Sequence, residues 1–125
     1  MGCIKTYLDR SRDLSVIEAI GDVGCEDFVI AVKKQASEYI TADIMILLSD
    51  GDMSNIAADD FTKLTDVAKE SWQARGQART VFVTGGAMNA LFSKLYSATA
   101  SITGSPISYK IVETRAEAFA WLDQN

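Results

Sequence analysis

The sequence predicts an α/β domain built on a mixed, mostly parallel β-sheet with helices packed on it, in the order β-β-α-β-α-β-α-β-α. Three observations carry this prediction. Two segments of alternating apolar residues at the start of the chain predict a β-hairpin. Two short, continuous apolar runs further on are typical of strands covered on both faces. Helical periodicity fills the segments between, and strands that alternate with helices imply parallel pairing through right-handed crossovers.

The first half of the chain supplies the hairpin, one helix and one buried strand. Apolar residues alternate over residues 4–8 and keep a period of two over residues 14–20. Mostly apolar side chains then recur every three or four residues, which predicts a helix. They are Phe28, Val32, Gln35, Ala36 and Tyr39. Residues 44–48 predict a strand buried on both faces, and a polar loop is expected over residues 49–58.

The second half alternates helices with strands. A helix is expected over residues 59–75, followed by a buried strand at residues 80–83. The glycines at 85–86 open a third helix, residues 107–111 alternate as a last strand, and residues 114–117 form a capping box that starts a final helix. The side chains expected to face the core are Phe61, Leu64, Ala68 and Trp72 in the first of these helices and Ala118, Trp121 and Leu122 in the last.

The composition is that of a globular protein, and residues 1–125 are interpreted as a single domain. Apolar residues make up 48% and charged residues 23% of the 125 residues, which is ordinary for a folded chain. The net charge is −5, from 17 acidic and 12 basic residues, and the basic residues form no cluster. Because an acidic surface repels phosphates, nucleic acid is not expected as a partner.

The cysteine and histidine content limits the compartment and the chemistry. Two cysteines, Cys3 and Cys25, favour a reducing compartment, so we expect a cytoplasmic protein. No apolar run approaches the roughly 20 residues that span a bilayer, so no transmembrane segment is expected. The chain has no histidine, which excludes Ser-His-Asp and Cys-His sites and removes the commonest metal ligand. Neither a cofactor nor a metal is expected.

The first residues fit a lipidation pattern. Met1-Gly2-Cys3-Ile4-Lys5-Thr6 matches N-myristoylation, with Cys3 available for palmitoylation. The modification requires a free, flexible N-terminus, whereas Ile4 is expected to begin a strand. Lipidation is therefore an alternative to a terminus that is built into the sheet.

The acidic loop after the first buried strand is the candidate site, because ligands gather at the carboxyl ends of strands in open α/β sheets. Asp50, Asp52 and Ser54 match three positions of a calcium loop, but Phe61 stands where the bidentate Glu should be. Asp50 and Asp52 also resemble the nucleophile and acid/base of haloacid-dehalogenase-type hydrolases. A metal-dependent adhesion site is a third interpretation, with Asp52 in place of its first serine. Turn chemistry and helix-end solvation explain the same residues without a ligand.

Two glycines, Gly85 and Gly86, precede the third helix. Free backbone N–H groups at a helix start can bind a phosphate. The segment has neither the lysine of a phosphate-binding loop nor the spacing of a dinucleotide fingerprint. A tight turn that needs residues without a Cβ explains both glycines.

Four segments carry a family resemblance. They are Gly21 ahead of an acidic helix start, residues 46–49, residues 79–83 with the helix after them, and residues 116–122. On these segments, and over nearly its whole length, the chain resembles the small stand-alone members of the STAS superfamily. These are anti-sigma-factor-antagonist-like (SpoIIAA-like) domains, related in fold to CRAL-TRIO lipid-binding domains. The resemblance implies a domain that binds and does not catalyse.

The resemblance also implies a site for a protein partner. In anti-sigma-factor antagonists, a serine at the start of the helix after the central strand is phosphorylated and controls docking to a partner kinase. The matching positions here are Ile56 and Ala57, and the nearest hydroxyl is that of Ser54. The phosphorylation switch is therefore in doubt. The partner surface expected from the resemblance is Asp52, Met53, Ser54, Asn55 and Ile56, with the helix that follows.

The likeness to CRAL-TRIO domains implies a lipophilic ligand beneath a mobile helix. The third helix would be the lid, and its apolar side chains are Met88, Leu91, Phe92, Leu95 and Tyr96. The alternative is ordinary packing of this helix against the sheet.

Three hypotheses about function remain. The first is a non-enzymatic, STAS-like regulatory domain that binds a protein partner or self-associates as a homodimer. The second is a carrier of a small lipophilic ligand, and the third is a metal-dependent hydrolase that uses Asp50 and Asp52. A protein binder should expose an apolar patch without a deep pocket. A carrier should contain an apolar cavity of about 300 Å3 or more, and a hydrolase should have carboxylates that converge on a metal.

Overall fold

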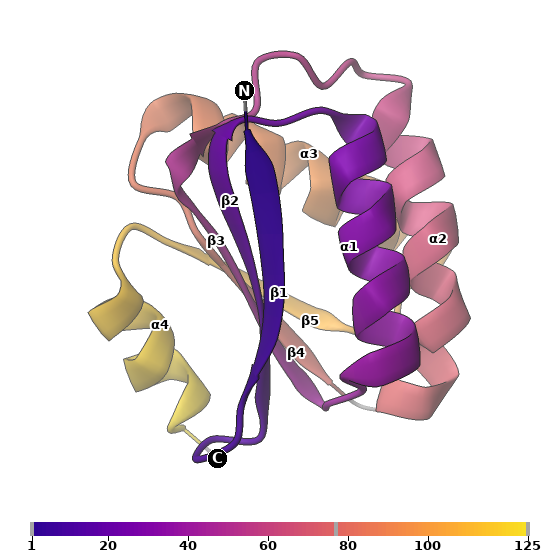
Figure 1. Ribbon diagram of the computed structural model, residues 1–125. Coiled ribbons are helices and arrows are strands. Elements are labelled where there is room, and N and C mark those ends of the chain that lie inside the picture. Colours follow the sequence, from indigo (N-terminus) through magenta and orange to yellow (C-terminus); the bar gives the residue numbers. More distant parts are fainter. Residues whose placement is uncertain (1, 77, 125) are drawn as a thin grey trace.

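Five strands form one sheet, and the computed structural model describes residues 2–76 and 78–124 of the chain. The spatial order is β1-β2-β3-β4-β5. The strands are β1 (Cys3–Asp9), β2 (Leu14–Asp22), β3 (Asp43–Asp52), β4 (Arg79–Val83) and β5 (Ser108–Val112). Strands β1 and β2 are antiparallel, and all later neighbours are parallel. The predicted fold class and element order are confirmed (Figure 1).

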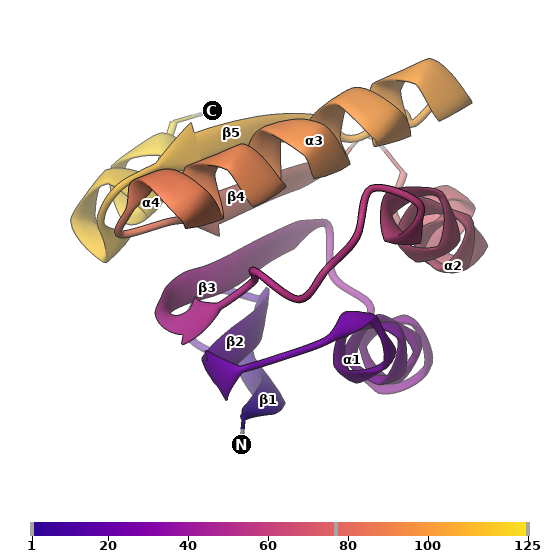
Figure 2. The ribbon, with the colours of Figure 1, turned by 90° about the horizontal axis from the view of Figure 1, so that it is seen from above.

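The helices lie on the two faces of the sheet in unequal numbers. They are α1 (Cys25–Glu38), α2 (Asp60–Arg75), α3 (Ala87–Thr103) and α4 (Arg115–Leu122). Seen from above, α1 and α2 lie on one side of the sheet, α4 on the other, and α3 runs beside β4 and β5 (Figure 2). The side chains of α3 join the same core as those of α1 and α2, so three helices share one face.

Local signals in the sequence explain where α4 and α1 begin. Thr114 is the N-cap of α4, and its side chain accepts a hydrogen bond of 3.2 Å from the backbone N–H of Glu117, as the capping box predicts. At the start of α1, Asp27 accepts a hydrogen bond of 2.9 Å from the backbone N–H of Gly24. The carboxylate also lies in the first turn, where the helix dipole favours negative charge.

The main core fills the space between the sheet and helices α1–α3. Three aromatic rings meet there: Phe28 on α1 stacks on Phe92 of α3 with ring centroids 5.3 Å apart, and Phe61 of α2 lies 5.4 Å from Phe92. Phe82 of β4 is fully buried in the same core, with its ring centroid 5.6 Å from that of Tyr96. A smaller core on the opposite face lies under α4, where Ala118 is buried and Phe119, Trp121 and Leu122 are partly buried.

The predicted start of the polar loop, at residue 49, is wrong. Strand β3 continues to Asp52 because its end pairs with the end of β2. After a register shift, Ile20 pairs with Asp50 and Asp22 pairs with Asp52. Backbone pairing thus draws polar residues into the strand, and the loop proper begins at Met53.

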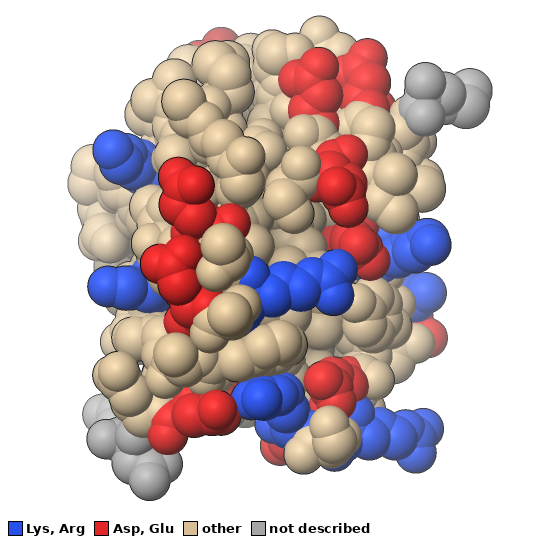
Figure 3. Space-filling model, turned by 90° about the vertical axis from the view of Figure 1, so that its left-hand side faces the viewer, with Lys and Arg blue, Asp and Glu red and all other residues tan. Residues whose placement is uncertain are grey.

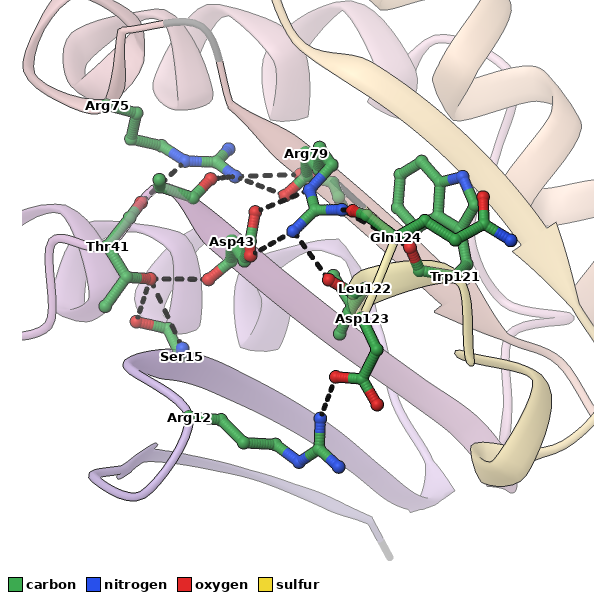
Figure 4. A network of polar contacts seen from close by, with 12 residues as sticks. Arg12, Ser15, Thr41, Asp43, Arg75, Arg79, Trp121, Leu122, Asp123 and Gln124 are labelled. Atoms are coloured by element: carbon green, nitrogen blue, oxygen red, sulfur yellow. Dashed lines mark hydrogen bonds and ion pairs between the residues drawn. The ribbon is translucent and has the colours of Figure 1, made fainter. Parts of the chain in front are cut away.

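The C-terminal end of α4 is held by a side chain of β4 (Figure 4). Arg79 binds the carboxylate of Asp43 with two nitrogens, at 3.0 and 2.8 Å. The same guanidinium donates to the carbonyl oxygens of Trp121, Leu122 and Gln124 at 3.3, 2.9 and 2.9 Å. Because the last carbonyls of a helix lack partners within it, the arginine satisfies two carbonyls of α4, those of Trp121 and Leu122, and one just beyond it, that of Gln124.

The N-terminal lipidation pattern begins at Met1, which lies outside the described residues. Gly2 is half-buried, and a Cβ at this position would lie 2.3 Å from the carbonyl oxygen of Asp22. Cys3 begins β1 and pairs with Ile20. Within the described ranges, each helix is too short or too polar to cross a bilayer.

Candidate functional site

The second half of β3 and the end of β4 are joined by one buried side chain, Asn89, in the first turn of α3. Its amide nitrogen donates to the carbonyl oxygens of Leu48 and Thr84 at 2.7 and 2.9 Å. Leu48 and Thr84 are almost fully buried, at 0% and 1% exposure. Sequence reasoning missed Asn89. A polar residue on the buried face of a helix close to its start was the available signal.

The two glycines before α3 have different roles. Gly85 has a φ of +64°, and a Cβ there would lie 2.6 Å from the Cβ of Ser49 on β3. Gly86 has an extended backbone, and nothing lies within 4 Å of its would-be Cβ. The tight-turn interpretation therefore accounts for Gly85, which lets β4 turn into α3 directly over the end of β3.

The segment between β3 and α2 is shaped by its own polar side chains. The carboxylate of Asp52 accepts a hydrogen bond of 2.9 Å from the backbone N–H of Ser54, and this bond lowers the pKa of Asp52. The amide of Asn55 donates to Asp22 at 2.6 Å, which ties the loop to the end of β2. The backbone N–H of Ala57 donates to the carboxylate of Asp60 at 2.8 Å. Ser54 and Asn55 remain exposed.

Helix α3 carries apolar residues on two different sides. Phe92 and Tyr96 are buried in the core, at 5% and 8% exposure. Met88, Leu91 and Leu95 are exposed at 60%, 51% and 43%. Phe92 and Tyr96 therefore pack in the core, as ordinary packing of this helix against the sheet predicts. Met88, Leu91 and Leu95 do not, because they face away from the core. A helix repeats every 3.6 residues, so the two sets point about a quarter of a turn apart.

The exposed residues of α3 and the loop after β3 form the two walls of one apolar groove. The groove has a volume of about 120 Å3. Its floor is Met53, Phe61 and Phe92, which are buried. Its walls are Ser54, Ile56 and Ala58 on the loop side and Met88, Leu91 and Leu95 on α3. Two sets of residues that the sequence assigned to separate functions thus lie at one site.

The carboxylates of this end do not converge on a metal position. Asp50 and Asp52 are exposed, and Asp22 in the next strand is engaged by Asn55. Within residues 2–76 and 78–124, no group of three or more Cys, Asp or Glu side chains is placed to hold a metal ion. This geometry therefore does not support a calcium loop, an adhesion site or a metal-dependent hydrolase at these residues.

A larger hollow lies at the opposite end of α2 and α3. It is a wide, open depression of about 600 Å3, and its lining includes Trp72, Gly76, Gly104 and Pro106. None of the predicted lid residues borders it. Among the residues singled out for a lipophilic ligand, Met88, Leu91, Phe92 and Leu95 border the small groove. Tyr96 lines a separate cavity of only about 30 Å3.

A five-stranded mixed sheet carries three helices on one face and one on the other, with an exposed loop ahead of α2. This arrangement is a SpoIIAA-like fold. A protein of the DUF3478 family from Shewanella loihica, described as having a SpoIIAA-like fold, superimposes with a TM-score of 0.62 at 18% identity over 98% of this chain and 95% of its own. The anti-sigma factor antagonist SpoIIAA in its unphosphorylated form gives a TM-score of 0.61 at 11% identity over 98% and 100%. No protein-family model and no curated protein matches the chain. The predicted resemblance is confirmed at the level of the fold.

Proposed function

We propose that this chain is a non-enzymatic regulatory domain that acts through protein–protein interaction. The observation that carries the proposal is the groove, in which an exposed loop on the SpoIIAA-like scaffold lies beside exposed apolar side chains. Exposed apolar patches with polar rims are typical of interaction sites. The proposed partner surface is Asp52, Met53, Ser54, Asn55 and Ile56, extended by the start of α2.

The proposed domain comprises residues 1–125 and works in the cytoplasm. Free thiols at Cys3 and Cys25 support a reducing compartment. The absence of histidine from the sequence supports a role without acid–base catalysis. Exposed, separated carboxylates at Asp50 and Asp52 support binding over hydrolysis.

We propose that docking at this site does not depend on phosphate at the start of α2. Ile56 and Ala57 have no hydroxyl to modify. The backbone N–H of Ala57 is already bound by the carboxylate of Asp60. A phosphate added nearby would meet that negative charge. Ser54 is the nearest exposed hydroxyl, and it precedes α2 by six positions.

The lipophilic carrier is less well supported. A groove of about 120 Å3 is smaller than the roughly 300 Å3 typical of small-molecule sites. The other alternative is a homodimer that forms through the same apolar face. Sedimentation distinguishes it from binding of a different protein, because only a homodimer forms in a solution of this chain alone.

Site-specific photocrosslinking in the native host tests the proposal. A photoreactive amino acid replaces Asn55 in the loop, and a matched variant carries it at Lys33, which is exposed on α1. The expected result is a discrete covalent adduct with one protein from position 55 and none from position 33. Equal labelling from both positions, or no adduct from position 55, would contradict a partner surface at this loop.

A further inference from the structure

The groove between the loop and α3 follows the axis of a helix. Met88, Leu91 and Leu95 are spaced by three and four residues, which places them in one row along α3. From Met88 to Leu95 this row is about 10 Å long at the helical rise of 1.5 Å per residue. A second helix laid along the row would present about two of its own turns, with apolar side chains at i, i+3 or i+4, and i+7.

The charges around the groove have one sign on the loop side. Asp50 and Asp52 precede the loop, and Asp59 and Asp60 follow it. Helix α3, the opposite wall, carries a single charged residue, Lys94. On the side of the molecule that carries α4, acidic side chains predominate in the upper part, at the carboxyl ends of the strands, whereas the middle and lower parts carry both signs of charge (Figure 3).

Few basic residues lie near the loop to offset its negative charge. Lys63 of α2 forms an ion pair with Glu26 of α1. The whole chain carries a net charge of −5. A second copy of this chain would therefore bring another acidic loop and another net negative charge toward the groove, whereas a basic segment would be attracted to it.

We propose that the groove binds an amphipathic helix of a partner protein whose apolar face fits the row Met88, Leu91 and Leu95 and whose polar face is rich in lysine or arginine. This proposal rests on the proposed function, and it specifies the chemistry of the partner at that same site. The apolar row supplies the contact energy. The acidic loop sets the direction of approach and selects against acidic helices.

A set of three synthetic peptides tests the proposal on the full chain. The first is an amphipathic helix with leucines on one face and lysines on the other. The second replaces every lysine by glutamate, and the third contains the residues of the first in scrambled order. Fluorescence anisotropy should show that the first peptide binds at least about tenfold more tightly than either control, a difference of about 1.4 kcal/mol. Its affinity should fall as salt is added, because the attraction is between exposed charges.

Matched variants locate the binding. Leu91→Ser changes a groove wall, while Ile102→Ser makes a similar change on the same helix at an 88% exposed residue that does not line the groove. Leu91→Ser should weaken binding of the basic peptide about tenfold, and Ile102→Ser should leave it unchanged. The double variant Asp52→Asn with Asp59→Asn should weaken binding and flatten its salt dependence, whereas Glu38→Gln at the far end of α1 should not.

Four outcomes overturn the proposal. Equal binding of the glutamate peptide removes the charge selection, and equal binding of the scrambled peptide removes the helical fit. A concentration-dependent dimer in sedimentation, lost in Leu91→Ser and not competed by the basic peptide, assigns the face to a second copy. A lipophilic molecule retained in native mass spectra and lost in Leu91→Ser assigns it to a ligand.

The outcomes also separate this inference from the proposed function. An adduct from position 55 in cells without binding of the basic peptide keeps the protein-binding function and rejects the basic helix. Specific binding of the peptide without an adduct from position 55 keeps the chemistry of the groove and rejects the proposed cellular function.

Discussion

The amide nitrogen of Asn89 lies 2.7 Å from the carbonyl oxygen of Leu48, so the first turn of α3 is bound directly to β3, four residues before the end of that strand. The same nitrogen reaches the carbonyl oxygen of Thr84, 2.9 Å away at the end of β4. Both carbonyl groups belong to buried residues. Asn89 therefore sets where α3 begins over the sheet, and with it the position of Met88 and Leu91 in the groove wall.

Replacing Asn89 by alanine should lower the free energy of unfolding by about 2–3 kcal/mol, because two buried carbonyl groups lose their donor. Urea unfolding followed by circular dichroism measures the change. The control is Asn55→Ala, which removes an exposed hydrogen bond to Asp22 and should cost less than about 1 kcal/mol. Equal losses of unfolding free energy in the two variants would show that the buried hydrogen bonds of Asn89 stabilise the fold no more than the exposed bond of Asn55 does.

Gly85 and Gly86 offer a second matched pair. Gly85→Ala should destabilise the fold by about 2 kcal/mol, because the new Cβ meets Ser49 and the left-handed backbone disfavours it. Gly86→Ala should change the free energy of unfolding by less than about 1 kcal/mol, since its backbone is extended and its surroundings are open. Thermal unfolding of the two variants side by side gives the comparison. A larger loss in Gly86→Ala would contradict this account of the turn.

The ion pair of Arg79 with Asp43 should matter more than that of Arg115 with Glu18. Arg79 binds the carboxylate of Asp43 with two nitrogens, and it also donates to three carbonyl groups at and just beyond the end of α4. Arg115 approaches Glu18 only to 3.5 Å and is more exposed than Arg79. Arg79→Met should cost about 2 kcal/mol and speed hydrogen exchange in α4, while Arg115→Met should cost about 0.5 kcal/mol or less. Unchanged exchange in α4 would mean that its apolar face alone holds it to the sheet.

The periodicity of the sequence was sufficient for the fold, because most strands and helices bury residues at positions that the pattern already marks. Residues 44–48 and 80–83 are continuous apolar runs, and both lie in central strands with neighbours on either side. The end of β3 could not be predicted in the same way. Asp50 and Asp52 are strand residues only because the backbone of β2 pairs with them, and a hydrophobicity pattern does not report pairing.

The candidate site was predicted in pieces. The loop at Asp52–Ile56 and the apolar residues of α3 were both recognised, but nothing in the spacing indicated that they would form one groove. Their meeting depends on Asn89 and Gly85, which position α3 over the end of β3 through contacts 41 and 36 residues away in sequence. Long-range contacts of this kind leave no local periodicity. The exposure of Leu91 beside buried Phe92 is likewise decided by the angle at which α3 packs.

Alkaline pH should destabilise the protein through its buried tyrosines. Burial raises the pKa of Tyr96 and of Tyr109 above the ordinary value of 10.0, so above about pH 10 the unfolded chain releases protons that the folded chain retains, and stability falls. Arg75 acts in the opposite direction: burial lowers its pKa to about 10, so between about pH 10 and its ordinary value of 12.5 the unfolded chain binds more protons and stability rises. Tyr96→Phe should therefore reduce the loss of unfolding free energy between about pH 8 and pH 11, measured in urea. Tyr7→Phe should reduce it less, because Tyr7 is 38% exposed. An equal effect of the two substitutions would show that burial of Tyr96 does not control the alkaline transition.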